Sequence, residues 1–201
     1  MIETLFPYVE LIKDDKLRLL CYNIIEQGQE QLKMPSSSSG KYHPKDELQE
    51  YGQVIHLKKA VNLILHAIRR DKRPLNVDIA VTIALLHDLP KKFNLEISVT
   101  PGQSRMNKNH GWDNAVTIDK EAEKLGIDYK TREIIFDAIA QHMGKWTPEG
   151  SIHYRPNGEL MLHTPYVEYL QEADYFASRR NVMVDYSFEI TQELYEEVIN
   201  G

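Results

Sequence analysis

The chain has 201 residues, of which 42% are hydrophobic and 27% are charged, as in an ordinary globular protein. Its formal charge of −6 argues against a broad basic surface for extended nucleic acid or anionic lipid, although a local positive site for one small phosphate compound is compatible with it. The single cysteine excludes an internal disulfide and a cysteine-based zinc site. Because the start lacks a signal-peptide pattern and no apolar run has the length of a membrane span, a cytoplasmic protein without membrane contact is expected.

The first half of the chain predicts helices separated by loops. Residues 3–33 repeat apolar side chains at helical spacing, and the proline, serines and glycine of 34–47 break that pattern. The segment 52–70 again carries apolar residues on one helical face and is ended by Pro74. Residues 76–89 are apolar nearly all round, which predicts a central, buried helix.

The second half continues in the same way. A looser stretch at 92–108 contains Pro101-Gly102, and the helix predicted at 109–126 is closed by Gly126 as a C-terminal cap. Further helices are predicted at 131–143, 165–180 and 187–199, with a loop at 144–162. No alternating strand pattern and no repeat is evident, so the predicted fold is a compact all-α bundle.

Five helical segments each direct an imidazole or a carboxylate toward the predicted interior. A single inward histidine is more often a hydrogen-bonded core residue, but five such segments together favour a metal centre. Buried carboxylates need a compensating partner, and a divalent cation supplies one. Mixed imidazole and carboxylate ligands suit Zn, Fe, Mn, Ni or Co better than Ca. The residues are His56, His87, Asp88, His110, His142 and Asp174.

The order of these residues resembles the HD superfamily of metal-dependent phosphohydrolases. The string ALLHDLPK (84–91) is similar to that family's central helix with its His-Asp-x-x-Lys ending, and QEADYFASR (171–179) is similar to its closing helix. His110 in NHG and His142 in IAQHMGKW are similar to the extended form that holds two metals. The resemblance covers about residues 50–180.

The resemblance implies three parts of the chain and a function. The parts are an N-terminal helical extension (1–34), a loop over or near the site (35–50) and the HD domain (51–201). The implied function is cleavage of a phosphoester of a nucleotide or similar small phosphate compound by a metal-activated hydroxide, with one or two divalent transition metal ions (Fe, Mn, Ni, Co or Zn).

The resemblance also implies residue roles. Metal one is held by His56, His87, Asp88 and Asp174, and metal two by His110 and His142, with Asp88 bridging. Asp88 and Lys91 are the implied catalytic residues. The substrate phosphate is expected to meet Lys91, Lys145 and Arg179, and also His43 if its loop folds over the site.

Several alternatives stay open from the sequence. The same six-ligand arrangement resembles that of HD-type di-iron oxygenases, which gives a second hypothesis for the function. A non-catalytic nucleotide-binding sensor is the third hypothesis. Trp146 and Tyr175 either stack a base or pack in the core, and the N-terminal helix either packs on the core or mediates a homodimer. His66, His153 and His163 are predicted to be non-ligands.

Overall fold

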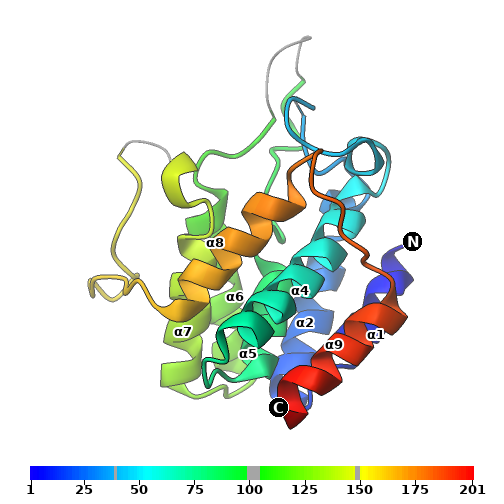
Figure 1. The fold of residues 1–201 in the computed structure, drawn as a ribbon. Coiled ribbons are helices and arrows are strands. Elements are labelled where there is room, and N and C mark those ends of the chain that lie inside the picture. Colours follow the sequence, from blue (N-terminus) through cyan, green and yellow to red (C-terminus); the bar gives the residue numbers. More distant parts are fainter. Residues whose placement is uncertain (39, 99–104, 148–149) are drawn as a thin grey trace.

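The computed structural model describes residues 1–38, 40–98, 105–147 and 150–201. Over these ranges the chain forms helices joined by turns, with two isolated β-bridges and no longer strand (Figure 1). The predicted all-α class is therefore confirmed. Pro101 and Gly102, in the looser stretch expected at 92–108, lie outside the described residues.

The long helix α4 (Gly52–Asp71) lies at the centre and packs against α5 (Val77–Leu86), α8 (Pro165–Ala177) and α9 (Phe188–Asn200). Its inward face buries the apolar residues that the sequence placed on one stripe. Helix α5 is buried at every position from residue 79 to 86, as expected for a segment that is apolar all round. Removal of these side chains from water is the main force that holds the bundle together.

Helices α6 (His110–Lys124) and α7 (Tyr129–Ala140) form an antiparallel pair. Gly126 follows α6 with a φ of +67°, and the Ile127 amide donates to the Ala122 carbonyl at 3.0 Å. This geometry closes a helix at a residue without a side chain, so the predicted glycine cap is confirmed. The next helix begins at once because the Asp128 carboxylate accepts the Thr131 amide at 3.0 Å.

The N-terminal region is not the continuous helix predicted for 3–33. It divides into η1 (Ile2–Leu5), α1 (Phe6–Val9), α2 (Asp15–Gln27) and α3 (Gln29–Leu32). The break before α2 is stabilised by Asp14, which caps the amides of residues 16 and 17, and by Asp78, which accepts the Asp14 amide at 2.8 Å. Helix α2 packs against α5 and α6, so this region contributes to the core.

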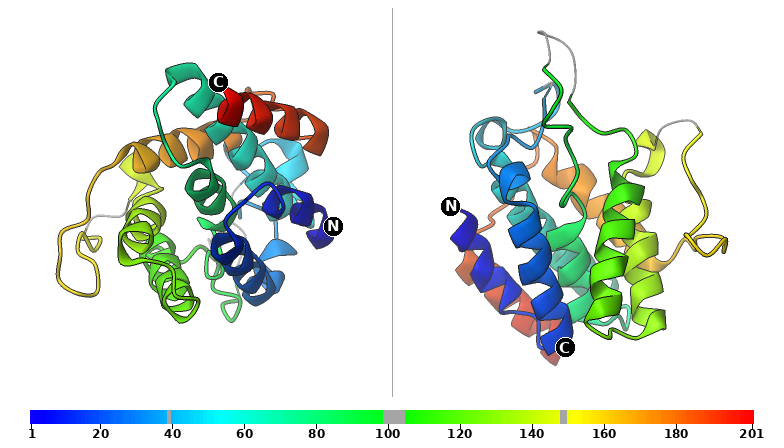
Figure 2. Two further views of the ribbon diagram at one scale, coloured as in Figure 1. Left: turned by 90° about the horizontal axis from the view of Figure 1, so that it is seen from below. Right: turned by 180° about the vertical axis from the view of Figure 1, so that it is seen from behind.

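The directions of the helices decide where the polar residues meet. The starts of α4 and α6 and the ends of α5, α7 and α8 all lie at the upper end of the bundle in Figure 1, and the views in Figure 2 show the same arrangement from below and behind. The short helices η2 (Lys45–Leu48) and η3 (Gly144–Trp146) lie at this end as well. No helix in the described part of the chain has the length and apolar character to cross a membrane.

Cys21 provides a test of the packing of α2. Its side chain is fully buried, and burial raises the pKa of the thiol to about 12. An unfolded thiol has a pKa near 8.5 and reacts as the thiolate, so at about pH 8 we expect iodoacetamide to label the native protein roughly a thousandfold more slowly than the urea-unfolded protein. Mass spectrometry of the alkylated chain measures both rates. Equal rates would contradict the burial of α2 against the core.

Candidate metal centre

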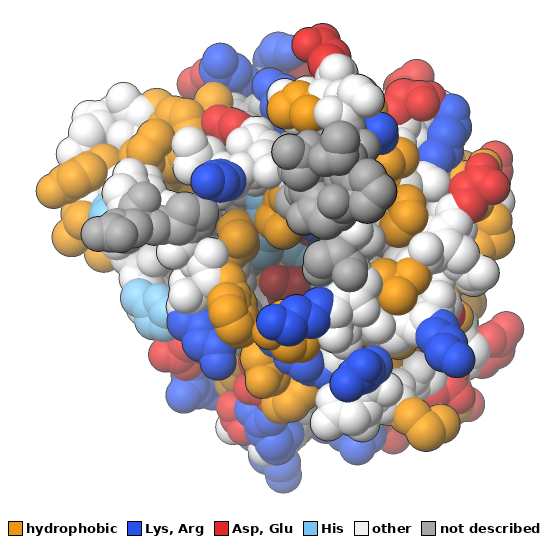
Figure 3. Space-filling view, turned by 90° about the horizontal axis from the view of Figure 1, so that it is seen from above, with side chains coloured by type: hydrophobic (Ala, Val, Ile, Leu, Met, Phe, Trp, Pro, Cys, Tyr) orange, Lys and Arg blue, Asp and Glu red, His pale blue; other side chains and the backbone are white. Residues whose placement is uncertain are grey.

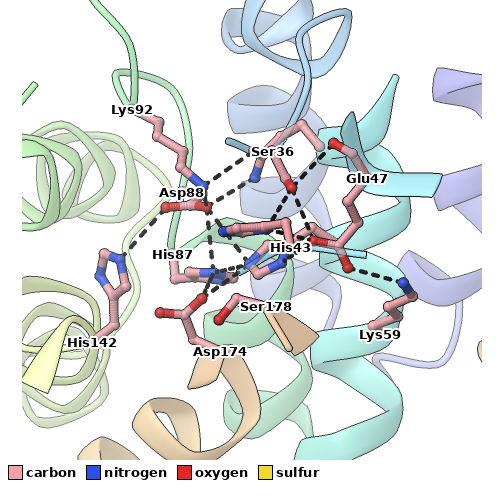
Figure 4. Close-up of polar contacts among 12 residues, drawn as sticks. Ser36, His43, Glu47, Lys59, His87, Asp88, Lys92, His142, Asp174 and Ser178 are labelled. Carbon is pink, nitrogen blue, oxygen red and sulfur yellow. Dashed lines mark hydrogen bonds and ion pairs between the residues drawn. The ribbon is translucent and has the colours of Figure 1, made fainter. Parts of the chain in front are cut away.

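Six polar residues from five elements meet at the upper end of the bundle. His56 lies in the first turns of α4 and Asp174 near the end of α8, while His110 is the first residue of α6. The predicted helices 76–89 and 131–143 end earlier than expected, so His87 and His142 lie just beyond the ends of α5 and α7. All are buried except Asp174, whose side chain is 25% exposed. Figure 4 shows how His87, Asp88, His142 and Asp174 face one another.

Three of the four histidines are oriented by backbone carbonyls. The Nδ1 atoms of His87, His110 and His142 lie 3.0, 2.8 and 2.7 Å from the carbonyl oxygens three residues earlier, at Ala84, Asn107 and Ile139. A carbonyl oxygen only accepts hydrogen bonds, so each Nδ1 carries the proton. The lone pair of each neutral ring is then on Nε2, the atom that faces the centre, which is the tautomer that a metal ligand requires.

The Nε2 atoms approach one another in two pairs. His56 Nε2 lies 3.3 Å from His87 Nε2, and His110 Nε2 lies 3.1 Å from His142 Nε2. Two nitrogen lone pairs at such distances repel each other unless a positive charge lies with them. The donor atoms are therefore suited to share a cation.

Asp88 lies between the two histidine pairs. Its Oδ2 is 3.8 Å from His56 Nε2 and 3.7 Å from His87 Nε2, whereas its Oδ1 is 3.3 Å from His110 Nε2 and 3.5 Å from His142 Nε2. One oxygen of this carboxylate thus faces each pair. Within each of these two groups, one ligand atom per residue lies within 4.8 Å of all the others.

Asp174 adds a second carboxylate on the side of the first pair, with Oδ1 at 3.1 Å from His56 Nε2 and 3.8 Å from His87 Nε2. A site of three or four imidazole and carboxylate ligands is one that a divalent transition metal accepts. The chemistry of these residues therefore fits the binding of a divalent transition metal.

The pKa shifts at the centre also favour positive charge close to these residues. Burial acts to raise the pKa of Asp88, but the Lys92 ammonium and the neighbouring imidazoles hold that pKa well below its usual range. Burial lowers the pKa of His87 to about 4. Burial also opposes the charging of His56, yet its hydrogen bonds to Asp174 and Glu47 outweigh this and raise its pKa to about 9. Ionised carboxylates in the interior thus require positive charge close to them.

Further polar residues support these side chains and were not singled out from the sequence. Gln53 Nε2 donates to Asp88 Oδ2 at 3.0 Å, and Asn114 donates from Nδ2 to the His87 carbonyl at 3.1 Å. Helical spacing could have indicated both, because Gln53 lies three residues before His56 and Asn114 four after His110. Glu47, which contacts His56, lies outside the long helices and had no such signal.

The structure changes the expectation for Lys91. Its side chain is exposed, and its backbone amide donates to Asn114 Oδ1 at 2.8 Å. The next residue, Lys92, is buried and forms an ion pair with Asp88 Oδ2. The reason is that α5 ends at Leu86 and residues 87–91 form turns, so helical spacing does not carry the direction of Asp88 forward to residue 91.

A pocket opens above the centre. Its volume of about 360 Å³ lies within the usual size range of small-molecule sites. Figure 3 looks into this end of the molecule and shows acidic and histidine side chains at the bottom of a hollow, with basic and hydrophobic side chains beside it. Residues of the centre form its floor, and the segment before α4 forms part of its wall. The lining includes Ser36, Tyr42, His43, Asp88, Lys92, Met106, His110, His142, Trp146, Asp174 and Arg179.

Three of the predicted substrate-binding residues line two adjoining pockets. His43 and Arg179 line this pocket, whereas Lys145 lines an adjoining pocket of about 480 Å³ that shares Arg179 with the first. The Arg179 guanidinium lies 4.0 Å from the ring centroid of Tyr175. Trp146 is 54% exposed and Tyr175 is 38% exposed, so neither is a core residue. Both rings are accessible to a ligand.

The other three histidines lie outside the centre. His66, His153 and His163 have exposed side chains. None belongs to the clusters of potential metal ligands found in the described ranges. They are suitable controls for substitutions in the centre.

A helical bundle that gathers four histidines and two aspartates at one end, beneath an open pocket, defines an all-α domain with a candidate divalent-metal centre. Residues 54–179, more than half of the chain, match the family described as HD domain, and the chain belongs to this family. No curated protein and no solved structure matches the chain. The HD family generally includes metal-dependent phosphohydrolases, which suggests a metal-dependent hydrolase.

Proposed function

We propose that this HD-domain protein hydrolyses a phosphoester of a nucleotide or a similar small phosphate compound, using one or two ions of Fe, Mn, Ni, Co or Zn. The observation that carries the proposal is the position of Asp88, with one carboxylate oxygen toward each pair of inward Nε2 atoms. The proposed ligands are His56, His87, Asp88 and Asp174 for one ion, and Asp88, His110 and His142 for the other.

The proposed catalytic roles fall to residues of the centre and to residues of the pocket. Bound divalent ions lower the pKa of a water molecule and offset charge on the phosphoryl oxygens. Lys92 supplies a positive charge beside Asp88, and Arg179 at the wall orients the phosphate. His43 is the pocket imidazole outside the proposed ligand set, so it is the candidate that gives a proton to the leaving oxygen.

Metal analysis followed by a phosphorus NMR screen tests this function. Freshly purified protein is analysed by mass spectrometry for its metals and then incubated under argon with nucleotides, cyclic nucleotides and sugar phosphates. We expect release of a phosphate product without oxygen. Turnover only in air, with oxygen uptake, would favour an oxygenase, and a ligand that binds but survives with every metal would favour a sensor.

Lys92 and Lys91 form a matched pair for a second test. Lys92→Met removes the buried ammonium beside Asp88, and we expect kcat/KM to fall by about a hundredfold, the size seen when one group that stabilises transition-state charge is lost. Lys91→Met removes an exposed ammonium and should leave kcat/KM unchanged. Metal content is measured in both variants. A larger effect at Lys91 would show that the first interpretation from the sequence was right.

A further inference from the structure

Glu47 is a buried acidic residue that lies outside the proposed ligand set and outside the matched range 54–179. It belongs to η2, in the segment that precedes α4. Its Oε2 lies 2.9 Å from Ser36 Oγ, 2.9 Å from His43 Nδ1 and 3.3 Å from His56 Nδ1, and its Oε1 accepts a hydrogen bond from Lys59 Nζ at 3.0 Å (Figure 4). Every one of these partners makes Glu47 more favourable as an ionised, fixed carboxylate.

His56 needs such a partner because of its place in the fold. His87 and His142 follow helix ends, where the last carbonyls have no intrahelical partner and accept the Nδ1 proton. His56 lies inside α4, where the preceding carbonyls accept the helix's own amide hydrogens. The Glu47 carboxylate, which comes from another segment, therefore accepts the Nδ1 hydrogen of His56, as a backbone carbonyl does for each of the other three rings.

We propose that Glu47 is a positioning residue for His56, so that the segment before α4 contributes to metal binding. The carboxylate keeps the proton on His56 Nδ1, turns Nε2 toward Asp88 and Asp174, and makes the imidazole a stronger ligand. The effect is confined to the ion held by His56, because the rings of His110 and His142 are held by carbonyls instead. The inference rests on the proposed function only in assuming that the centre binds metal.

Hydrogen bonds hold the segment that carries Glu47 at two places. His43 joins Ser36 to Glu47, and Lys59 holds Glu47 against α4. On the other side, the Tyr42 carbonyl accepts the Arg180 amide at 2.8 Å, just after α8. The segment that carries Glu47 is thus held by α4 and by the residues that follow α8.

The test is a Co²⁺ titration of the metal-free protein, followed by visible absorption and by mass spectrometry of the bound metal. Glu47→Gln keeps the shape of the side chain and removes its charge, and we expect one of the two binding steps to weaken by about 10- to 100-fold while the other is unchanged. Glu50→Gln changes an exposed acid three residues later and should alter neither step. Far-UV circular dichroism of each metal-free variant verifies the fold.

A double-mutant cycle separates positioning from a general structural role. In a His56→Ala background, Glu47→Gln should have no further effect on Co²⁺ binding, because the ring it orients is gone. Unchanged binding in Glu47→Gln, equal weakening of both steps, or a full additional loss in the His56→Ala background would each overturn the inference, as would a wild-type chain that binds no Co²⁺. A wild-type chain that binds Co²⁺ in two steps but cleaves no phosphoester would overturn the phosphohydrolase alone.

Discussion

Replacing Asp88 by alanine should remove both bound metal and phosphoester hydrolysis. One oxygen of this carboxylate faces each histidine pair, so its loss takes a ligand from each proposed ion. We expect metal affinity and kcat/KM each to fall by more than about a hundredfold, above the 10- to 100-fold range that is typical when a residue behind a ligand is lost. Mass spectrometry of bound metal and phosphorus NMR of product measure the two effects.

The same substitution leaves the buried Lys92 ammonium without its carboxylate, which alone is a destabilising change of about 3–5 kcal/mol. Asp88→Asn also removes the charge but keeps the shape of the side chain and an oxygen that accepts a hydrogen bond from Lys92, so a comparison of the two variants separates loss of metal from loss of fold. Thermal unfolding of the metal-free variants checks this. His66→Ala, His153→Ala and His163→Ala should retain metal and turnover. Full metal content in both Asp88 variants would show that the centre is wrongly assigned.

Gly52→Ala should destabilise the protein, although a glycine-to-alanine change in a helix ordinarily stabilises it by about 0.5–1 kcal/mol. A Cβ atom at Gly52 would lie 2.0 Å from the Glu47 carbonyl oxygen and 2.5 Å from the Glu47 carbonyl carbon. Neither atom belongs to a flexible side chain, so the backbone of η2 must move. We expect a loss of about 1–3 kcal/mol in the free energy of unfolding, the range for overpacked sites.

The displacement of η2 also moves Glu47 away from His56, so the ion held by His56 should bind more weakly in Gly52→Ala. Urea unfolding of the metal-free protein and a Co²⁺ titration measure the two effects. Gln49→Ala, an exposed change close by, is the matched control and should alter neither. An increase in stability with unchanged Co²⁺ binding would mean that α4 and η2 do not approach each other as closely as the structure places them.

The helices were largely predictable because they depend on nearby residues. Gly126 closes α6, and the apolar stripe of α4 is the face that is buried. The polar residues that interrupt this pattern could also be found, since each lies at or beside such a stripe. The ends of helices were less predictable: α5 stops at Leu86, which placed Lys92 rather than Lys91 against Asp88.

Contacts between distant segments could not be predicted in this way. Asp78 accepts the Asp14 amide from 64 residues away and stabilises the break before α2. The backbone of η2 lies so close to Gly52 that it leaves no room for a side chain there, and the Glu47 carboxylate contacts His56 in α4. No periodicity connects such residues, because their separation along the chain carries no information on their separation in space.

By itself, the sequence determined an all-α chain with histidines and aspartates on the predicted inward faces of its helices, because periodicity and capping act over a few residues. The resemblance to the HD family came from its motifs and not from periodicity. Only the tertiary structure decided how these side chains meet: Asp88 lies between two pairs of Nε2 atoms, Lys92 pairs with Asp88, and Glu47 contacts His56 from the side away from the centre. Those positions follow from how whole helices pack and where each one ends, which is a property of the assembled core.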